Sequence, residues 1–358
     1  MQISSRAIVA GWKHHITGIG LETAYFAGLA GFAERKAAGH GIILKFQRVR
    51  PRSNRAFQPL RADEITPSFL RRTLATLKRR NFDIVSIDDA CERIKHPAGP
   101  RRFAVLTFDG GYGDFRTYGY PVLQSHDVPF TVYVSTGLID GVAFPWWLGL
   151  EAVVAQTSRI SLVMNGEERR FRSTSVAEKY QVFDVIYQWL RGLPAGDATV
   201  ALKDMCTRYH VDLKDSVRGA LMTWTDLSIL ASDARATIGS ATINHGMLTV
   251  LSEAAARRDI ALGRRVLESA LGRDCLHFAY PFGKDGTFTG REMRIVRDAG
   301  FASAVSSRAG LVAPGGANDV FDLPRLQWDG SRSSVRVLQV LMSGLGLPRR
   351  NRMPKPGH

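Results

Sequence analysis

The chain of 358 residues carries 48 Lys and Arg against 33 Asp and Glu, a formal net charge of +15. Its 45% hydrophobic and 23% charged residues exclude a disordered chain and are typical of a soluble globular protein of one to three domains. No apolar run approaches the roughly 18 residues of a membrane span, and the first residues lack the apolar centre of a signal peptide. We therefore expect a cytoplasmic protein.

The positive charge favours anionic partners such as acidic polysaccharide or a membrane surface. Part of it lies in segment 348–358, which we expect to be a basic tail able to touch an anionic surface. No nucleic-acid-binding motif accompanies the charge, so nucleic acid is not an expected partner. The three cysteines, Cys91, Cys206 and Cys275, lack metal-site spacing and predict buried thiols without a disulfide.

The first part of the chain, 1–40, predicts a helical segment from its mixed apolar spacing. A strand is expected at 41–46, followed by a helix at 65–80 with a proline near its first turn. The next strand is expected at 82–87, and Asp88 and Asp89 are expected to cap the helix that follows it.

Strands and helices then alternate along most of the chain. Strands are expected at 104–108, 129–135, 236–239, 277–280 and 302–306, with helices at 115–126, 252–271 and 289–299. This alternation predicts parallel strands joined by right-handed helical crossovers. Polar residues just past the carboxyl ends of such strands share one rim, where barrels of parallel strands build their sites.

The alternation breaks at about 144–230. Asn165 and Gly166 supply the two positive-φ positions of a type I′ turn, which predicts a hairpin over 160–171 with helices after it. We interpret this part as an insertion over the rim, either a simple elaboration or an aromatic wall for a glycan groove. The predicted organisation is a helical segment (1–40), a barrel with the insertion (41–330), and a helix with a basic tail (331–358).

Segment 104–114, Ala-Val-Leu-Thr-Phe-Asp-Gly-Gly-Tyr-Gly-Asp, ends an apolar strand in a carboxylate and a glycine turn, a common way to hold a catalytic acid or base rigidly. It resembles the first signature, Thr-Phe-Asp-Asp-Gly, of the NodB-homology polysaccharide deacetylases (carbohydrate esterase family 4). The resemblance implies an irregular (β/α)7 barrel and a catalytic base at Asp109. It also places Gly110 where the family has a metal-binding aspartate.

Segment 238–245 resembles the family signature His-Ser/Thr-x-x-His, which supplies two metal-binding imidazoles. His245 is kept, and Ala241 replaces the other histidine. Each ligand of a structural zinc site carries on the order of 3 kcal/mol, so losing two of three ligands weakens binding by about 5 kcal/mol or more. We therefore expect a zinc-like divalent metal, with His245 as one ligand, only if the family mechanism survives. Asp114 or Asn244 is a possible substitute ligand, but Asp114 is better explained as the cap of helix 115–126.

A third segment, 277–283, resembles the family's Pro-Tyr/Phe-Gly motif. The resemblance implies that Phe282 offers its backbone N–H to an oxyanion, with Pro281 shaping the turn. In some family members an arginine orients the base; here Arg325 either takes that place or pairs with a surface acid, which we favour. The expected sugar-contacting residues are Tyr112, Trp147, Tyr280 and Pro281.

Two retained side chains have more than one interpretation. Asp109 is either the catalytic base or a buried carboxylate held by backbone N–H groups of the glycine turn. His245 is either a hydrogen-bonded pocket histidine or, with a near-neutral pKa, a general acid. Restoring Gly110→Asp with Ala241→His is expected to recover metal binding if the rest of the pocket is intact.

The resemblance implies hydrolysis of the N-acetyl amide of a chitooligosaccharide or another N-acetylated oligo- or polysaccharide. Amide hydrolysis needs an activated water, a base, an acid for the leaving amine and donors for the oxyanion. Because two metal ligands are replaced, two alternatives stay open. One is a catalytically silent carbohydrate-binding or scaffold protein in polysaccharide synthesis. The other is a metal-free hydrolase that uses Asp109 and His245 as a pair.

Overall fold

The computed structural model describes residues 41–96, 101–217, 219–313, 319–331, 334–345 and 347. The helical segment predicted for 1–40 and the basic tail at 348–358 lie outside the described residues. Within them, no helix is long and apolar enough to cross a membrane. The three cysteines are buried free thiols, as predicted.

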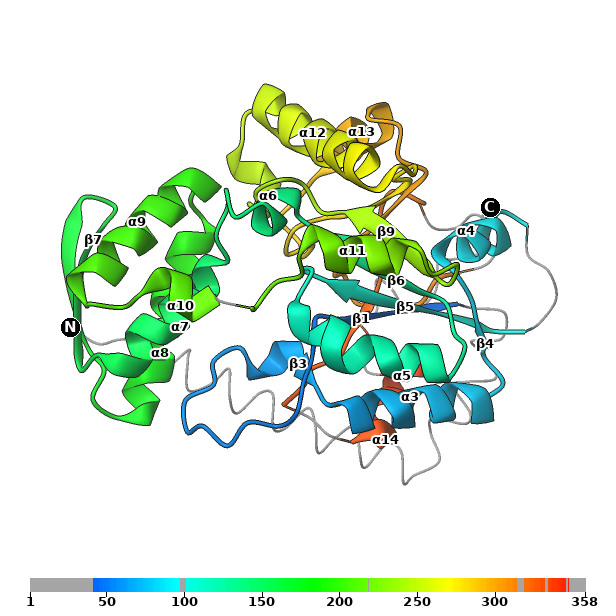
Figure 1. The fold of residues 1–358 in the computed structure, drawn as a ribbon, viewed down its shortest axis with the longest axis horizontal. Coiled ribbons are helices and arrows are strands. Elements are labelled where there is room, and N and C mark those ends of the chain that lie inside the picture. The colour runs from blue at the N-terminus through cyan, green and yellow to red at the C-terminus, as the bar shows by residue number, and fades with distance from the viewer. Residues whose placement is uncertain are drawn as a thin grey trace.

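A curled parallel sheet forms the centre of the molecule (Figure 1). Its strands lie in the order β11-β10-β9-β6-β5-β1-β12, and β4 also pairs with β5. With the surrounding helices, this arrangement is the predicted irregular (β/α)7 barrel. The strands are β1 Ile42–Phe46, β4 Asp83–Ile84, β5 Phe103–Asp109, β6 Phe130–Val134, β9 Ala236–Ser240, β10 His277–Ala279, β11 Ser303–Val305 and β12 Leu326–Gln327. A separate short ladder joins β2 Arg48–Val49 to β3 Glu64–Ile65.

Helices cover the outside of the sheet. Several begin at a residue whose side chain accepts a hydrogen bond from the first turn; at the start of α3, Thr66 accepts from the Phe69 N–H at 3.1 Å, just before Pro67. The helices of the barrel are α3 Pro67–Arg79, α4 Ile87–Lys95, α5 Tyr120–Ser125, α6 Thr136–Ile139, α11 Trp224–Ala231, α12 Glu253–Leu271, α13 Gly290–Asp298 and α14 Val335–Met342, with 3-10 turns η1 Arg61–Asp63 and η3 Leu248–Val250.

Two capping predictions were wrong. Ser86, not Asp88 or Asp89, caps α4 by accepting the Asp89 N–H at 3.0 Å. The predicted helix at 115–126 begins with a π-helical turn, η2 Phe115–Gly119, before α5, and its preceding Asp114 makes no capping hydrogen bond. The carboxylate of Asp114 instead accepts from the Arg48 Nε–H at 2.7 Å, because a charged partner on β2 lies within reach.

The two faces of the strands have different neighbours, as the period of two along a strand requires. Ile42, Leu44 and Phe46 of β1 belong to the main core that the outer helices complete. The alternate residues of β1 and β5 point into the barrel, where Ile43 and Val105 pack with Tyr133 in a smaller apolar cluster. Lys45, Thr107 and Asp109 continue this inner face toward the carboxyl ends of the strands.

The insertion forms its own layer beside the barrel, on the left of the view in Figure 1. It contains α7 Trp146–Gln156, the hairpin of β7 Arg159–Met164 and β8 Glu167–Arg172, α8 Val176–Arg191, α9 Ala195–Arg208 and α10 Leu213–Val217. The hairpin turn has the predicted geometry, with φ of 54° at Asn165 and 83° at Gly166. Leu150, Ile186 and Leu202 are fully buried in a core that also takes in Tyr112 of the barrel.

Candidate active site

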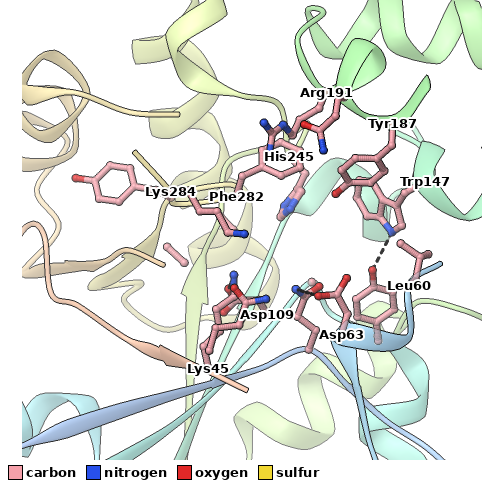
Figure 2. A pocket seen from close by; sticks show the side chains of 18 residues that line it. Lys45, Leu60, Asp63, Asp109, Trp147, Tyr187, Arg191, His245, Phe282 and Lys284 are labelled. Atoms are coloured by element: carbon pink, nitrogen blue, oxygen red, sulfur yellow. Dashed lines mark hydrogen bonds and ion pairs between the residues drawn. The ribbon is translucent and has the colours of Figure 1, made fainter. Parts of the chain in front are cut away.

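A cavity of about 190 Å³ opens at the carboxyl ends of the parallel strands (Figure 2). Lys45 of β1, Asp109 at the end of β5, His245 after β9 and Phe282 after β10 all line it, because the carboxyl ends of parallel strands meet at one rim. The insertion closes the other side of the cavity with Trp147, Tyr187, Gln188 and Arg191.

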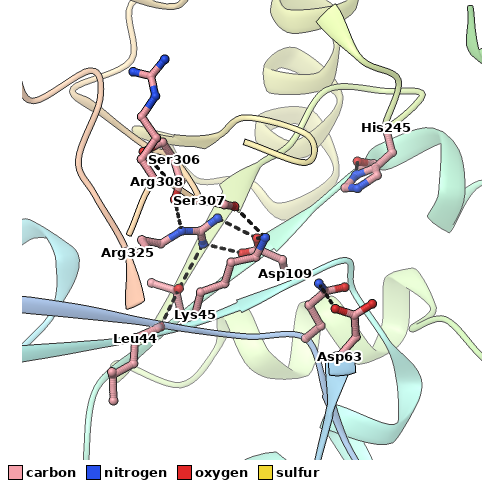
Figure 3. A network of polar contacts seen from close by, with 12 residues as sticks. Leu44, Lys45, Asp63, Asp109, His245, Ser306, Ser307, Arg308 and Arg325 are labelled. Carbon is pink, nitrogen blue, oxygen red and sulfur yellow. Dashed lines mark hydrogen bonds and ion pairs between the residues drawn. The ribbon is translucent and has the colours of Figure 1, made fainter. Parts of the chain in front are cut away.

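The carboxylate of Asp109 is held by two buried cations (Figure 3). Arg325, which is fully buried, donates from both terminal nitrogens to the two carboxylate oxygens at 2.7 Å. The Lys45 Nζ lies 3.3 Å from the second oxygen. Burial alone would raise the pKa of Asp109, but the charge of Arg325 and then that of Lys45 outweigh it and hold the pKa below its ordinary value.

This geometry corrects two expectations. Arg325 pairs with Asp109 rather than with a surface acid, because its Nε also donates to the Ser306 carbonyl at 2.6 Å and fixes the guanidinium inside the barrel. Asp109 is held by these side chains and not by backbone N–H groups of the glycine turn. Arg325 thus stands where the resemblance implied an arginine that orients the base, and Asp109 also fixes the Lys45 ammonium.

Lys45 is the buried cation that reaches the cavity itself. Its ammonium donates to the Ser307 Oγ at 2.8 Å and pairs with Asp109. Burial lowers the pKa of Lys45, and the charge of Asp109 opposes that effect. An ammonium has three N–H donors, so its two partners among the described residues, Ser307 and Asp109, leave one donor for a group in the cavity.

The hydrogen bonds of His245 define its tautomer. The Ser135 Oγ donates its single proton to the Ala241 carbonyl at 2.6 Å, so at its 2.9 Å contact with His245 it accepts from Nδ1–H. The other ring nitrogen, Nε2, carries the lone pair, and no described residue bonds to it. Burial lowers the pKa of His245 to about 4, so the imidazole is neutral near pH 7 and does not have the near-neutral pKa expected of a resting general acid.

The backbone around the cavity is held in unusual conformations. Thr242, His245 and Phe282 have φ of 69°, 52° and 61°, a region that residues other than glycine rarely adopt. Phe282 is the central residue of a γ-turn closed by the Gly283 N–H donating to the Pro281 carbonyl at 2.7 Å. Such positions cost on the order of 1–3 kcal/mol each and cluster at functional sites, where the surroundings maintain them.

The turn at Phe282 leaves a donor available. No described residue accepts from the Phe282 N–H, whereas the neighbouring Gly283 carbonyl accepts from the Ser307 N–H at 2.7 Å. The Phe282 ring packs 5.7 Å from the His245 ring, measured between centroids. A free N–H next to a neutral imidazole is the pairing that acyl hydrolysis uses for its oxyanion and its base.

The residues present do not fit a metal ion. Among the described residues, no group of three or more His, Cys, Asp and Glu side chains could hold a metal ion. The Asn244 amide donates to Asp259 at 2.7 Å, and Asp114 pairs with Arg48, so neither substitutes for a missing ligand. The cations Lys45 and Arg325 beside Asp109 would also repel a divalent ion.

Gly110 cannot simply be exchanged for a ligand. Its φ is +97°, and a Cβ there would lie 2.6 Å from the Tyr112 Cε2. The Tyr112 hydroxyl in turn accepts from the Trp147 Nε1–H at 2.9 Å, which fixes the ring against the insertion. The turn is therefore built around a glycine.

The predicted sugar-contacting residues are distributed unevenly. Tyr112 and Trp147 line the cavity, and the Trp147 ring lies 5.5 Å from that of His245. Tyr280 also lines it, but its ring stacks 3.9 Å from Phe288 and its hydroxyl donates to the Phe321 carbonyl at 2.9 Å. Pro281 is buried in the γ-turn and does not line the cavity.

Several charged residues of the cavity were not predicted from the sequence: Lys45, Asp63, Arg191 and Lys284. Lys45 had a signal, a single charge within an otherwise apolar strand. The others lie in loops or at a helix end, where the sequence gives no such signal. Burial raises the pKa of Asp63 to about 6, although Lys45 and then Lys284 oppose the rise, and Gln47 donates to its carboxylate at 2.8 Å.

Solved structures of similar fold include deacetylases. The chain is similar to the deacetylase PplD of Streptococcus pyogenes, solved in complex with acetate, at a TM-score of 0.55 and 16% identity, covering 84% of this chain and 98% of that one. It is similar to IcaB of Ammonifex degensii at 0.54 and 16%, covering 84% and 97%. A polysaccharide deacetylase of Bacillus cereus gives 0.53 and 12%, covering 85% and 68%.

At these identities the likeness shows a shared fold. The chain has the fold of the polysaccharide deacetylases, as the three sequence motifs implied. No protein-family model and no curated protein matches the sequence.

Proposed function

We propose that the protein hydrolyses the N-acetyl amide of an N-acetylated oligo- or polysaccharide, and that it does so without a metal ion. The deacetylase fold and the position of the cavity at the rim support the reaction class. The observation that carries the proposal is a neutral His245 whose Nε2 bonds to no described residue, beside two donors that the described residues do not use, the Phe282 N–H and one N–H of Lys45.

In this reaction a water attacks the acetyl carbonyl carbon, and His245 Nε2 takes one of its protons. The carbonyl oxygen becomes an oxyanion, for which the Phe282 N–H and the Lys45 ammonium are the available donors. The C–N bond then breaks, and the imidazolium returns the proton to the leaving nitrogen. Acetic acid and the amino sugar are the first products, and the acid then gives its proton to the amine, so acetate and the ammonium form of the sugar leave and all atoms and charges balance.

The cavity volume also limits what can enter. About 190 Å³ is smaller than the roughly 300–1,000 Å³ of a pocket for a drug-sized ligand. One acetylated sugar residue is therefore the expected occupant, and the rest of the glycan would lie outside. Tyr112 and Trp147 provide the aromatic wall for that residue.

The test is acetate release from N-acetylated oligosaccharides by the wild type and by His245→Asn. Asparagine tolerates the positive φ at this position but cannot take up the proton, so we expect a loss of about 10²- to 10⁴-fold. His210→Asn is the matched control, because His210 is exposed and also has a positive φ, 55°. Unchanged activity in His245→Asn would remove His245 as the base, and binding without hydrolysis by the wild type would favour a silent carbohydrate-binding protein.

A further inference from the structure

Two cations at the cavity form no ion pair with a carboxylate of the described residues. Arg191, the last residue of α8, and Lys284, two residues after Phe282, both line the cavity, and no carboxylate of the described residues forms an ion pair with either. The Arg191 guanidinium carbon lies 5.8 Å from the centre of the Phe282 ring. Figure 2 shows both side chains near the His245 and Phe282 side of the cavity.

The carboxylates of the cavity do not neutralise these charges. Asp109 is already shared between Arg325 and Lys45. Asp63 accepts from Gln47 and feels both Lys45 and Lys284, so it offsets at most one of the remaining cations. The site therefore has an excess of positive charge. Its four cations are Lys45, Arg191, Lys284 and the buried Arg325, and its two carboxylates are Asp63 and Asp109.

A neutral N-acetylated sugar would leave this excess unused. Unpaired cations in a concave site concentrate anionic ligands, and a guanidinium forms paired hydrogen bonds with a carboxylate or a phosphate. The placement of Arg191 matters here, because the insertion brings it to the rim from outside the barrel.

We propose that Arg191 and Lys284 bind an anionic oxygen group, a carboxylate or a phosphate, on the sugar that enters the cavity, so that the substrate is an acidic acetylated glycan. This inference rests on the proposed function for the position of the sugar, and it names the substrate class of that same site. An acidic substrate is also consistent with the formal net charge of +15 of the whole chain.

The test is calorimetric binding of the full chain to three probes at low and at physiological salt. The probes are the neutral disaccharide of N-acetylglucosamine, the disaccharide of N-acetylglucosamine and N-acetylmuramic acid, and N-acetylglucosamine 6-phosphate. We expect one anionic probe to bind about 10- to 100-fold more tightly than the neutral one, with the advantage shrinking as salt rises. The probe that gains identifies the anion as carboxylate or phosphate.

Arg191→Gln and Lys284→Gln should each remove most of this advantage and leave binding of the neutral probe within about twofold, as expected where only the charge-assisted bond is lost. Arg71→Gln on α3 is the control, because it removes an exposed charge that does not line the cavity and forms no ion pair with another described residue. Circular dichroism confirms that each variant is folded. Equal binding of all three probes, no binding of any, or an anionic preference that survives in both variants would overturn the inference.

The outcome is separable from that of the proposed function. Tight binding of an anionic probe without acetate release would keep this inference and contradict hydrolysis. Acetate release from the neutral disaccharide with no gain from an anionic group would support hydrolysis and contradict this inference.

Discussion

At the scale of single residues, the ion cluster of Asp109, Arg325 and Lys45 lies at the position where the resemblance implied a catalytic base beside a metal ion. Arg325 presents a planar fork to the carboxylate, and both of its hydrogen bonds are buried. A paired buried charge is not in itself stabilising, but removing one partner leaves the other uncompensated. Replacing any one of these three side chains is therefore expected to destabilise the protein.

Arg325→Met is expected to lower the free energy of unfolding by about 3–5 kcal/mol, because Asp109 would keep its charge in a buried site. The double variant Arg325→Met with Asp109→Asn should cost less than the sum of the single changes. Urea denaturation measures both. Arg101→Met, which removes an exposed pair with Asp83 at 3.2 Å, is the control and should cost at most about 1 kcal/mol. Equal costs for Arg325→Met and the control would contradict the account.

Asp63 makes stability depend on pH. Burial raises its pKa from an ordinary 3.8 to about 6, so the folded protein binds more protons than the unfolded chain between these values. Its contribution to the free energy of unfolding is therefore complete below about pH 4 and is lost as the pH rises through about 6. The lowered pKa of His245 has the opposite sign over the same range, since the unfolded chain then binds the extra proton.

Asp63→Asn should therefore gain stability relative to the wild type as the pH rises from about 4 to about 7, and the gain should be constant above that. Denaturation curves at half-unit pH intervals measure the difference. A constant difference at every pH would show that Asp63 does not titrate in this range.

At the scale of elements, the turns after β5, β9 and β10 determine the site more than the strands do. The turn after β5 uses φ of 97° and 63° at Gly110 and Gly111, and the turn after β10 places Phe282 in a γ-turn. At Gly110, the φ of 97° and the Tyr112 ring, 2.6 Å from where a Cβ would lie, disfavour the aspartate that the resemblance places at this position. The turn geometry as well as the residue identity therefore opposes a metal ligand there.

This reverses the expectation for restoring the ligands. Gly110→Asp with Ala241→His is expected to bind no metal stoichiometrically and to lower the free energy of unfolding, because the new Cβ at Gly110 meets the Tyr112 ring in a backbone conformation that disfavours it. Metal analysis after dialysis, together with thermal unfolding, measures both effects. Ala241→His alone is the comparison, and one tightly bound metal ion per double-variant chain would contradict the prediction.

The sequence predicted the elements better than their ends. Alternating strands and helices were enough for the barrel, because its buried strands are continuous apolar runs between helices with clear caps. Asp114 was misassigned because its partner, Arg48, lies 66 residues away in the chain. Arg325 was misassigned for the same reason, since its pairing with Asp109 spans 216 residues. Local patterns carry no signal for such contacts.

At the scale of the whole molecule, the barrel brings together residues from five strand ends and the insertion supplies the opposite wall. His245 and Phe282 could be identified from motifs, but Arg191 and Lys284 reach the cavity only through the tertiary structure. The fold is therefore that of the polysaccharide deacetylases, whereas the charged residues Lys45, Arg191 and Lys284 of the cavity lie outside the three motifs. The proposed function requires that hydrolysis proceeds with His245, Phe282 and Lys45 and without a metal ion.

The most direct measurement is the rate of acetate release from N-acetylated oligosaccharides, acidic ones included, by protein treated with a strong chelator and shown by elemental analysis to be free of metal. We expect release to persist after this treatment, to be unchanged by added zinc, and to be lost in His245→Asn. Release that appears only on adding zinc, in proportion to one bound ion per chain, would contradict the account.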